Sequence, residues 1–376
     1  MRVSESLYTL LQQLLDNTLL ASRQAIADDQ PVSAIQLCVD APELGLFWQG
    51  SAGFTDRSQT IAVSPEHPMR IASTSKTFVA AAILRLWEEG TVDLDCSIRE
   101  YLAPEHLAMI SRGGYDPDHI TTRHLLSHTS GLVDYADSEA LAQGVLKDPQ
   151  HQWTRTEQLA MAMSLGRRYG RPGDIYRYSD TGYILLGEII EKASGLSLGL
   201  ALRNLLNFAG LGLRRTWLEN YETAPVAVLP RIHQYEAQYD IRDVDGSFDI
   251  HGGGGLISTV GDMACFFKAL FTGAVFNNKA TLATMLSTVA ATGGGPAYNG
   301  NQQIPGTYCL GLQKGAITTP DGRSLVTYSH GGYYGTYAAY LPQSNIAMAL
   351  SINQHCAKQA REAMLQGIYA LLGIAQ

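Results

Sequence analysis

The order of apolar and polar residues predicts β-strands near both ends of the chain. Residues 34–40 and 44–54 are mainly apolar and are separated by a short turn containing Pro42, a pattern typical of two paired strands. Towards the C-terminus, short apolar or alternating segments are separated by turn residues such as Asp321-Gly322, which is typical of antiparallel hairpins. The strands predicted there cover residues 308–313, 324–330, 336–341 and 346–352.

A helical period in the apolar residues predicts helices in the rest of the chain. Within residues 5–29, leucines such as Leu7 and Leu11 recur at helical spacing among polar residues, which indicates an amphipathic helix packed on a core. Thr154 opens another helix, because Glu157 follows it at the spacing of a capping box. The other predicted helices cover residues 75–89, 121–130, 181–193, 262–271 and 357–372.

Strands at both ends with helices between them predict an α/β fold with one antiparallel sheet built from the two termini. We expect residues 1–76 and 256–376 to form the α/β region with this sheet. Residues 77–255 would then form an inserted, mainly helical region, with a cleft between the two regions. Residues 291–306 are rich in Gly, Pro and Asn, and we expect this loop to be the most flexible stretch.

Composition excludes several classes of partner. The net charge is −8 and the sequence has no Lys/Arg cluster, which argues against nucleic acid or an anionic membrane as a partner. The five cysteines are scattered and form no CxxC pair, so neither a disulfide framework nor a zinc site is indicated. No apolar run has the length of a signal peptide core or a membrane span. We therefore expect a cytoplasmic protein, unless a leader has been removed.

The first chemical motif is Ser73-Thr-Ser-Lys76 at the start of a predicted helix. Residues three apart share one helix face, so the amine of Lys76 can reach the hydroxyl of Ser73. A serine hydroxyl needs an adjacent base to become a nucleophile, and a desolvated lysine can be that base. A helix N-terminus also directs backbone N–H groups at developing negative charge. Alone, this spacing occurs often by chance.

Two further motifs have both a catalytic and a structural interpretation. Tyr178-Ser-Asp180 opens a predicted helix, where the phenol could pass protons near the nucleophile. The structural alternative is a surface tyrosine with Asp180 as helix N-cap. His330-Gly331-Gly332 ends a predicted strand, and its glycines would let a ligand approach the backbone. The structural alternative for that segment is a tight turn with an incidental histidine.

Together, the three motifs resemble those of the class C β-lactamase and DD-peptidase superfamily. That group includes D-aminopeptidases, D-amino acid amidases and family VIII esterases, and its motifs are Ser-x-x-Lys, Tyr-x-Asn and Lys/His-x-Gly in this order. The resemblance covers roughly residues 33–355 and extends beyond the motifs. The supporting segments are residues 70–78, 125–132, 178–187 and 254–259.

The resemblance implies a class C β-lactamase-like fold and a set of catalytic roles. Ser73 would be the acylated nucleophile, and Lys76 and Tyr178 would share the general base and acid work. The backbone N–H groups of Ser73 and Tyr333 would form the oxyanion hole. The resemblance implies neither a metal nor an organic cofactor.

The resemblance also implies four substrate-binding residues, and two of them differ from the family pattern. Besides Gly331 and Gly332, they are Asp180, where the family usually has asparagine, and His330, where β-lactamases of this class usually have lysine. An ionised carboxylate can only accept hydrogen bonds, and it favours the charged form of Lys76. We therefore expect Asp180 to disfavour β-lactams with an acylamino side chain and to tolerate esters or substrates with a free amine. Histidine is also a weaker fixed cation than lysine for a substrate carboxylate.

These observations favour a serine hydrolase that acts on a small ester, amide or short peptide, with weak or no β-lactamase activity. D-amino-acid amides and peptides are the preferred amide substrates. The alternatives are a DD-carboxypeptidase or penicillin-binding protein, a true class C β-lactamase, or an inactive binding protein of the same fold. The sequence indicates no oligomeric state.

Two other patterns have competing interpretations. Gly195-Leu-Ser197-Leu-Gly199 matches the nucleophile elbow of α/β-hydrolases, but the segment before it has a helical pattern where the elbow needs a strand. His124 and His128 have zinc-binding spacing, yet the glutamate of that motif is missing. We expect both histidines to have local structural roles.

Overall fold

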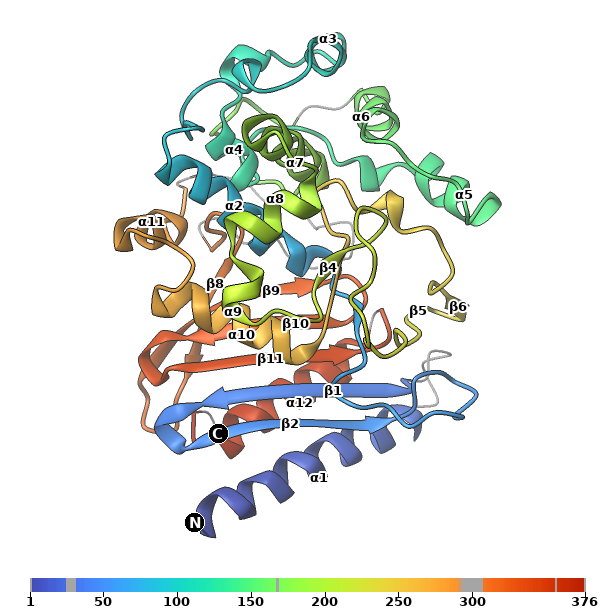
Figure 1. The fold of residues 1–376 in the computed structure, drawn as a ribbon, viewed down its shortest axis with the longest axis vertical. Helices are drawn as coiled ribbons and strands as arrows, with labels where there is room; N and C mark the ends of the chain where they lie inside the picture. Colours follow the sequence, from blue (N-terminus) through green and yellow to red (C-terminus); the bar gives the residue numbers. More distant parts are fainter. Residues whose placement is uncertain are drawn as a thin grey trace.

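A six-stranded antiparallel sheet forms one half of the molecule (Figure 1). The computed structural model describes residues 2–24, 32–166, 169–289, 291, 307–355 and 357–374. The strand order is β2-β1-β11-β10-β9-β8. The bounds are β1 (Ala34–Ala41), β2 (Leu46–Gly53), β8 (Gln313–Thr318), β9 (Ser324–Gly332), β10 (Thr336–Leu341) and β11 (Ile346–Ile352).

The two ends of the chain meet in the middle of this sheet. Ile35 of β1 pairs with Ile352 of β11, so the N-terminal hairpin and the C-terminal strands form one continuous sheet. Every residue of β11 is buried, because helices cover both faces of the sheet there. The antiparallel sheet built from both termini is therefore confirmed, and so is the α/β fold class.

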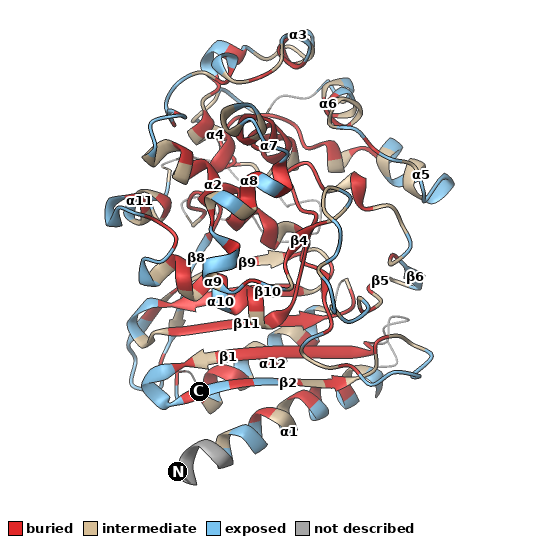
Figure 2. Ribbon diagram, in the orientation of Figure 1, coloured by how far each residue is buried: buried red, intermediate tan, exposed pale blue. Residues whose placement is uncertain are grey.

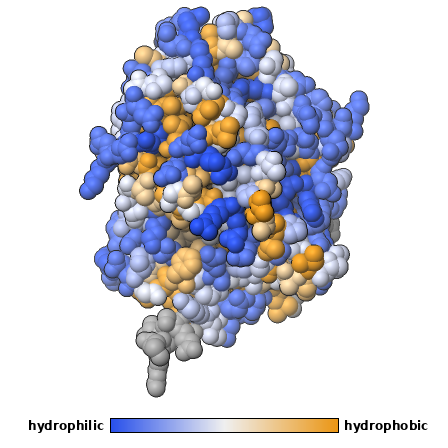
Figure 3. Space-filling model, in the orientation of Figure 1, coloured by the Kyte–Doolittle hydropathy of each residue, from blue (hydrophilic) through white to orange (hydrophobic). Residues whose placement is uncertain are grey.

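Amphipathic helices supply the cover on each face. Helices α1 (Arg2–Gln24) and α12 (Lys358–Leu371) pack together on one face, where Leu11 and Ile368 share a core with the strands. Helix α10 (Val260–Thr272) covers the opposite face (Figure 1). Among the described residues, no helix combines the length and apolar character of a membrane span. In the view of Figure 3, hydrophobic residues form separate patches among hydrophilic ones.

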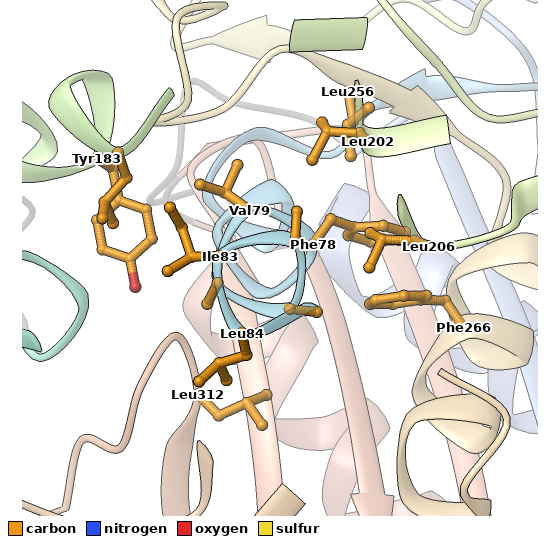
Figure 4. Close-up of a cluster of buried hydrophobic side chains, with 14 of the residues drawn as sticks. Phe78, Val79, Ile83, Leu84, Tyr183, Leu202, Leu206, Leu256, Phe266 and Leu312 are labelled. Carbon is orange, nitrogen blue, oxygen red and sulfur yellow. The ribbon is translucent and has the colours of Figure 1, made fainter. Parts of the chain in front are cut away.

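Helix α2 (Ser75–Glu88) is the centre of the other half of the molecule. It packs against α7 (Asp180–Ser194), α8 (Leu198–Leu205) and α10, and most of its residues are buried (Figure 2). The ring of Phe78 stacks on that of Phe266 from α10, with centroids 3.7 Å apart (Figure 4). Burial on all sides fixes the position of the helix whose first turn follows Ser73.

Shorter elements complete the fold. β3 (Met69–Arg70), β7 (Leu256–Ser258) and β4 (Trp217–Leu218) form a small sheet, and β5 (Tyr235–Glu236) pairs with β6 (Tyr239–Asp240). The remaining α-helices are α3 (Pro104–Arg112), α4 (Thr122–Leu126), α5 (Glu139–Lys147), α6 (Arg155–Ser164), α9 (Phe208–Leu211) and α11 (Lys279–Met285). The predicted capping box at the start of α6 is present.

Two predicted elements are wrong. The helix expected over residues 121–130 ends at Leu126, because His128 adopts a left-handed backbone conformation with φ of 56°. The strand expected over residues 308–313 begins instead at Gln313, since Gly311 makes a left-handed turn there with φ of 82°. Of the loop expected to be flexible, residues 292–306 lie outside the described residues. The proposed division into residues 1–76 with 256–376 and 77–255 stays a proposal.

The end of β9 is where the sheet meets the chain just before Ser73. At Gly332, an added Cβ would lie 2.2 Å from Ile71 O and 2.1 Å from Thr336 Oγ1, whereas at Gly331 the nearest atom would be 3.8 Å away. Thr336 Oγ1 also donates a hydrogen bond of 2.9 Å to Ile71 O. Only a glycine at position 332 permits this close approach.

We predict that Gly332→Ala lowers the free energy of unfolding by about 1–3 kcal/mol through overpacking. Gly331→Ala is the matched control and should keep or slightly raise stability, since it restricts only the unfolded chain. Thermal unfolding midpoints of the two variants measure this difference. Equal midpoints would contradict the close approach of β9 to Ile71.

Candidate active site

Ser73 lies in a strained turn at the start of α2. A 3₁₀ turn spans Ala72–Thr74, and Ala72 has a left-handed φ of 46°, a costly conformation for a residue other than glycine. The Ile71 N–H donates to Leu256 O of β7 over 3.0 Å, and Thr74 Oγ1 lies 3.5 Å from His330 O of β9. Contacts from both sides therefore hold the turn that presents Ser73.

Lys76 is fully buried directly behind Ser73. Its Nζ donates a hydrogen bond of 2.9 Å to Ser73 Oγ, lies 2.5 Å from Asp180 Oδ1 in an ion pair, and donates to Gly253 O. The contact with Asp180 is an ion pair by distance alone, because Oδ1 has no hydrogen-bond partner among the described residues, so the hydrogen bonds of Nζ go to Ser73 and Gly253. The predicted contact between Asp180 and Lys76 is present.

Tyr178 also forms a hydrogen bond with the side chain of Ser73. Burial, and then the charge of Asp180, raise the pKa of Tyr178 well above 10, so the phenol is neutral. Its ring packs against that of His128, with centroids 4.1 Å apart. His128 Nδ1 accepts the Ser179 N–H over 3.1 Å, which fixes this ring beside Tyr178.

His330 is buried in β9 and carries no positive charge. Burial, and then the neighbouring Lys76, lower the pKa of His330 to about 3. Nδ1 lies 2.9 Å from Gly331 O, which can only accept, so Nδ1 is the protonated nitrogen. Nε2 then accepts from the hydroxyl of Tyr308, 3.0 Å away. Both ring nitrogens are occupied, so this histidine supplies no cation to the site.

Two further carboxyl groups surround the ion pair of Lys76 and Asp180. Asp134 accepts the backbone N–H of Asp180, and burial with the charge of Asp180 raises the pKa of Asp134 well above its usual range. Burial raises the pKa of Asp249 to about 7, with opposing contributions from Lys76 and Asp180. The carboxyl of Asp249 makes no hydrogen bond with a described residue.

These groups border one cavity of about 990 Å³. Ser73, Tyr178 and His330 lie in its wall, together with Tyr333, whose N–H is predicted to complete the oxyanion hole. Apolar residues of α5, such as Leu141, line it further out. Among the described residues, no group of three His, Cys, Asp or Glu side chains is placed to hold a metal ion.

The structure brings the predicted site residues together from three separate parts of the chain. Ser73 and Lys76 come from the start of α2, Tyr178 and Asp180 from the start of α7, and His330 with the two glycines from β9. Their assigned roles stay predictions. Sequence reasoning missed Asp134, Asp249, Tyr308 and His128 as members of the site. Of these four residues, only His128 could have been found from the sequence, because it lies in one of the segments that resemble the superfamily.

The structure contradicts two of the alternative interpretations, the nucleophile elbow at Ser197 and the N-cap role of Asp180. Ser197 is the N-cap of α8 and follows helix α7, so the strand that a nucleophile elbow requires is not there. Asp180 is the first residue of α7, whose N-cap is Ser179, so the carboxylate is not that cap. His124 Nδ1 accepts the Thr121 N–H at the start of α4, a different partner from that of His128.

Comparison with known proteins assigns the chain to a family. A family model described as Beta-lactamase matches residues 39–369. The chain belongs to the Beta-lactamase family. The predicted superfamily resemblance is thereby confirmed. Its curated relatives include penicillin-binding protein 4* of Bacillus subtilis, 29% identical over 202 residues, which are 52% of this chain and 39% of that protein.

A second curated relative matches a longer part of this chain. The mitochondrial serine beta-lactamase-like protein LACTB of Homo sapiens is 27% identical over 304 residues, covering 65% of this chain and 54% of that protein. The chain thus spans about two fifths to half of the length of these curated relatives.

Solved structures resemble nearly the whole chain. A D-stereospecific amidohydrolase from Streptomyces sp. is 25% identical, with a TM-score of 0.73 and coverage of 94% of this chain and 97% of that one. The D-amino acid amidase from Ochrobactrum anthropi SV3, complexed with L-phenylalanine amide, is 23% identical, with a TM-score of 0.75 and coverage of 97% and 99%. These matches confirm the β-lactamase-like fold of this family member.

The raised pKa of Asp249 predicts a specific dependence of stability on pH. The folded protein holds this proton up to about pH 7, whereas an unfolded chain releases it near pH 4. Stability from this group is therefore full below about pH 4 and is lost as the pH rises towards 7. Asp249→Asn should gain stability relative to wild type across that interval.

Thermal unfolding at pH 4.5 and pH 8 tests this, with Asp243→Asn as the control because that side chain is exposed on the same loop. The midpoint difference between Asp249→Asn and wild type should grow with pH, and that of the control should stay constant. A difference that does not change with pH would contradict the raised pKa of Asp249.

Proposed function

We propose that this member of the Beta-lactamase family is a serine hydrolase that forms an acyl-enzyme on Ser73. The observation that carries the proposal is that the Ser73 hydroxyl is hydrogen-bonded to both Lys76 and Tyr178, at a cavity large enough for a small substrate. One adjacent base can activate a serine nucleophile, and a second proton-transfer group can protonate the leaving group.

The proposed reaction has two halves. Ser73 Oγ attacks the substrate carbonyl carbon, its proton passes to Lys76, and the backbone N–H groups of Ser73 and Tyr333 stabilise the oxyanion. The intermediate collapses as the leaving alkoxide or amine takes a proton delivered through Tyr178. Water then attacks the acyl-enzyme, and the carboxylic acid product leaves Ser73 free.

A neutral His330 argues for substrates without a carboxylate near the scissile bond. A lysine at this position would offer a permanent cation, whereas His330 has both nitrogens occupied and a pKa lowered to about 3. Asp180 replaces an amide donor by an acceptor and repels a carboxylate as well. We therefore place β-lactams and peptides with a free C-terminus among the poor substrates.

An uncompensated carboxyl argues for substrates that carry an amine. Asp249 faces the cavity, has no hydrogen-bond partner among the described residues, and lies near Asp180 and Lys76. A substrate ammonium group would supply the missing partner and favour the ionised carboxyl. D-amino-acid amides, and peptides without a free C-terminal carboxylate, fit this requirement, whereas small esters meet only the condition that no carboxylate lies near the scissile bond. The D-amino acid amidase and D-stereospecific amidohydrolase among the similar structures support that substrate class.

Rates on three substrates test the proposal. We expect turnover of a short-chain p-nitrophenyl ester and of a D-alanyl amide to exceed that of a chromogenic cephalosporin by about 100-fold or more, which corresponds to about 2.7 kcal/mol. Ser73→Ala should abolish all activity. Rapid cephalosporin turnover would refute the substrate assignment. Absence of any turnover and of fluorophosphonate labelling would favour a binding protein instead.

The role of position 330 can be tested separately. His330→Lys places a cation in the cavity wall, so acylation by a cephalosporin should rise about tenfold relative to the neutral ester, as one charge-assisted hydrogen bond allows. His330→Gln is the control, because it also replaces the ring but adds no charge. An equal change in both variants would refute an electrostatic role for this position.

A further inference from the structure

The direction of the hydrogen bond between Lys76 and Ser73 poses a chemical problem. Nζ donates to Ser73 Oγ and to Gly253 O, and it lies 2.5 Å from Asp180 Oδ1 in an ion pair. A base must offer a lone pair to the serine proton, and an ammonium group has none. Lys76 must therefore lose a proton before it can accept the one from Ser73.

Other groups near Ser73 cannot replace Lys76 as the base. The phenol of Tyr178 is neutral, because its pKa is raised well above 10. His330 holds its only lone pair in the hydrogen bond from Tyr308, and His128 holds that of Nδ1 in the bond from Ser179. The serine proton has to leave through Lys76.

Asp180 is placed to take the proton that Lys76 must lose. Its Oδ1 is 2.5 Å from Nζ in an ion pair and has no hydrogen-bond partner among the described residues. The two hydrogen-bond acceptors of Nζ are the nucleophile itself and a backbone carbonyl, which is a very weak base. Both neighbouring carboxyls, Asp134 and Asp249, are affected by the charge of Asp180, which raises the pKa of each. A proton on Asp180 would relieve this repulsion.

We propose that Asp180 is the proton acceptor that frees the amine of Lys76 to act as the base for Ser73. An N–H bond of Lys76 breaks and an O–H bond forms on Asp180, which leaves a neutral amine and a neutral acid. Ser73 Oγ then bonds to the carbonyl carbon as its proton moves to Nζ. The proton held by Asp180 returns through Lys76 and Tyr178 to the leaving group, so the ion pair is restored.

This role makes Asp180 a catalytic residue that asparagine cannot replace, because an amide accepts no proton at neutral pH. The inference rests on the proposed function, since it concerns the acylation of Ser73. It also gives a reason for the departure from the Tyr-x-Asn pattern: the carboxylate would pair with Lys76 and take its proton, where an amide would bind substrate.

The pH dependence of acylation in Asp180→Asn tests the relay. The rate of Ser73 labelling by a fluorophosphonate would be measured between pH 6 and 9 in wild type and variant. The titratable groups facing Asp180 and Lys76 are Tyr178, Asp134, Asp249, Tyr135, Tyr183, His128 and His330. They are common to both proteins, so a change in the slope of the profile belongs to position 180.

We expect Asp180→Asn to label about 100-fold more slowly at pH 7, the usual contribution of a proton-transfer group. Its rate should rise about tenfold per pH unit, because solvent must then remove the lysine proton, while the wild-type rate stays nearly level. Asp243→Asn is the control, since that carboxyl is exposed and lies outside the cavity wall, and it should follow the wild-type profile.

A variant that labels as fast as wild type with a level profile would overturn the relay. Failure of the wild type to label at Ser73 would instead overturn the proposed function, so the two outcomes are distinct. Thermal unfolding would establish that Asp180→Asn is folded. If it is not, Asp180→Ser repeats the test with a smaller side chain that also lacks an acid of comparable strength.

Discussion

A buried ammonium group is the constraint around which this site is built. Lys76 has no exposed surface, and a charge removed from water in this way is tolerated only when it is paired and fully hydrogen-bonded. Its partners come from three places: the turn before α2, the start of α7 and the glycine turn at Gly253. Because these partners all contact the one buried amine, their contacts fix the position of Ser73 relative to Asp180 of the second motif.

The scaffold holds this arrangement through close backbone approaches. Helix α2 is packed on every side, with Phe78 stacked on Phe266, and β9 approaches Ile71 so closely that position 332 has no room for a side chain. The left-handed Ala72 stores strain in the turn that presents Ser73. Rigid elements on both sides keep the geometry that acyl transfer requires.

The sequence predicted the parts of the site that depend on local spacing. Ser73 and Lys76 are neighbours on one helical turn, and an apolar pattern with turn residues was enough to place most of the sheet. Tyr178 and His330 could be placed only by resemblance to a family, because nothing local brings distant segments together.

What the sequence could not predict arises from tertiary contacts and backbone conformation. Asp249 lies in a loop without a periodic pattern, and its significance comes from burial beside Lys76 and Asp180. The neutral state of His330 depends on Tyr308, which lies just before the left-handed Gly311, in a segment where the sequence wrongly predicted a strand. Left-handed residues such as His128 end elements that periodicity alone would extend.

The central claim is that Ser73 forms a covalent acyl-enzyme. Rapid mixing with a p-nitrophenyl ester, followed by acid quenching and peptide mapping by mass spectrometry, measures this directly. The account predicts one acyl group per chain on the peptide that contains Ser73, and none in Ser73→Ala. An acyl group on Ser197, or turnover of the ester without any adduct, would contradict it.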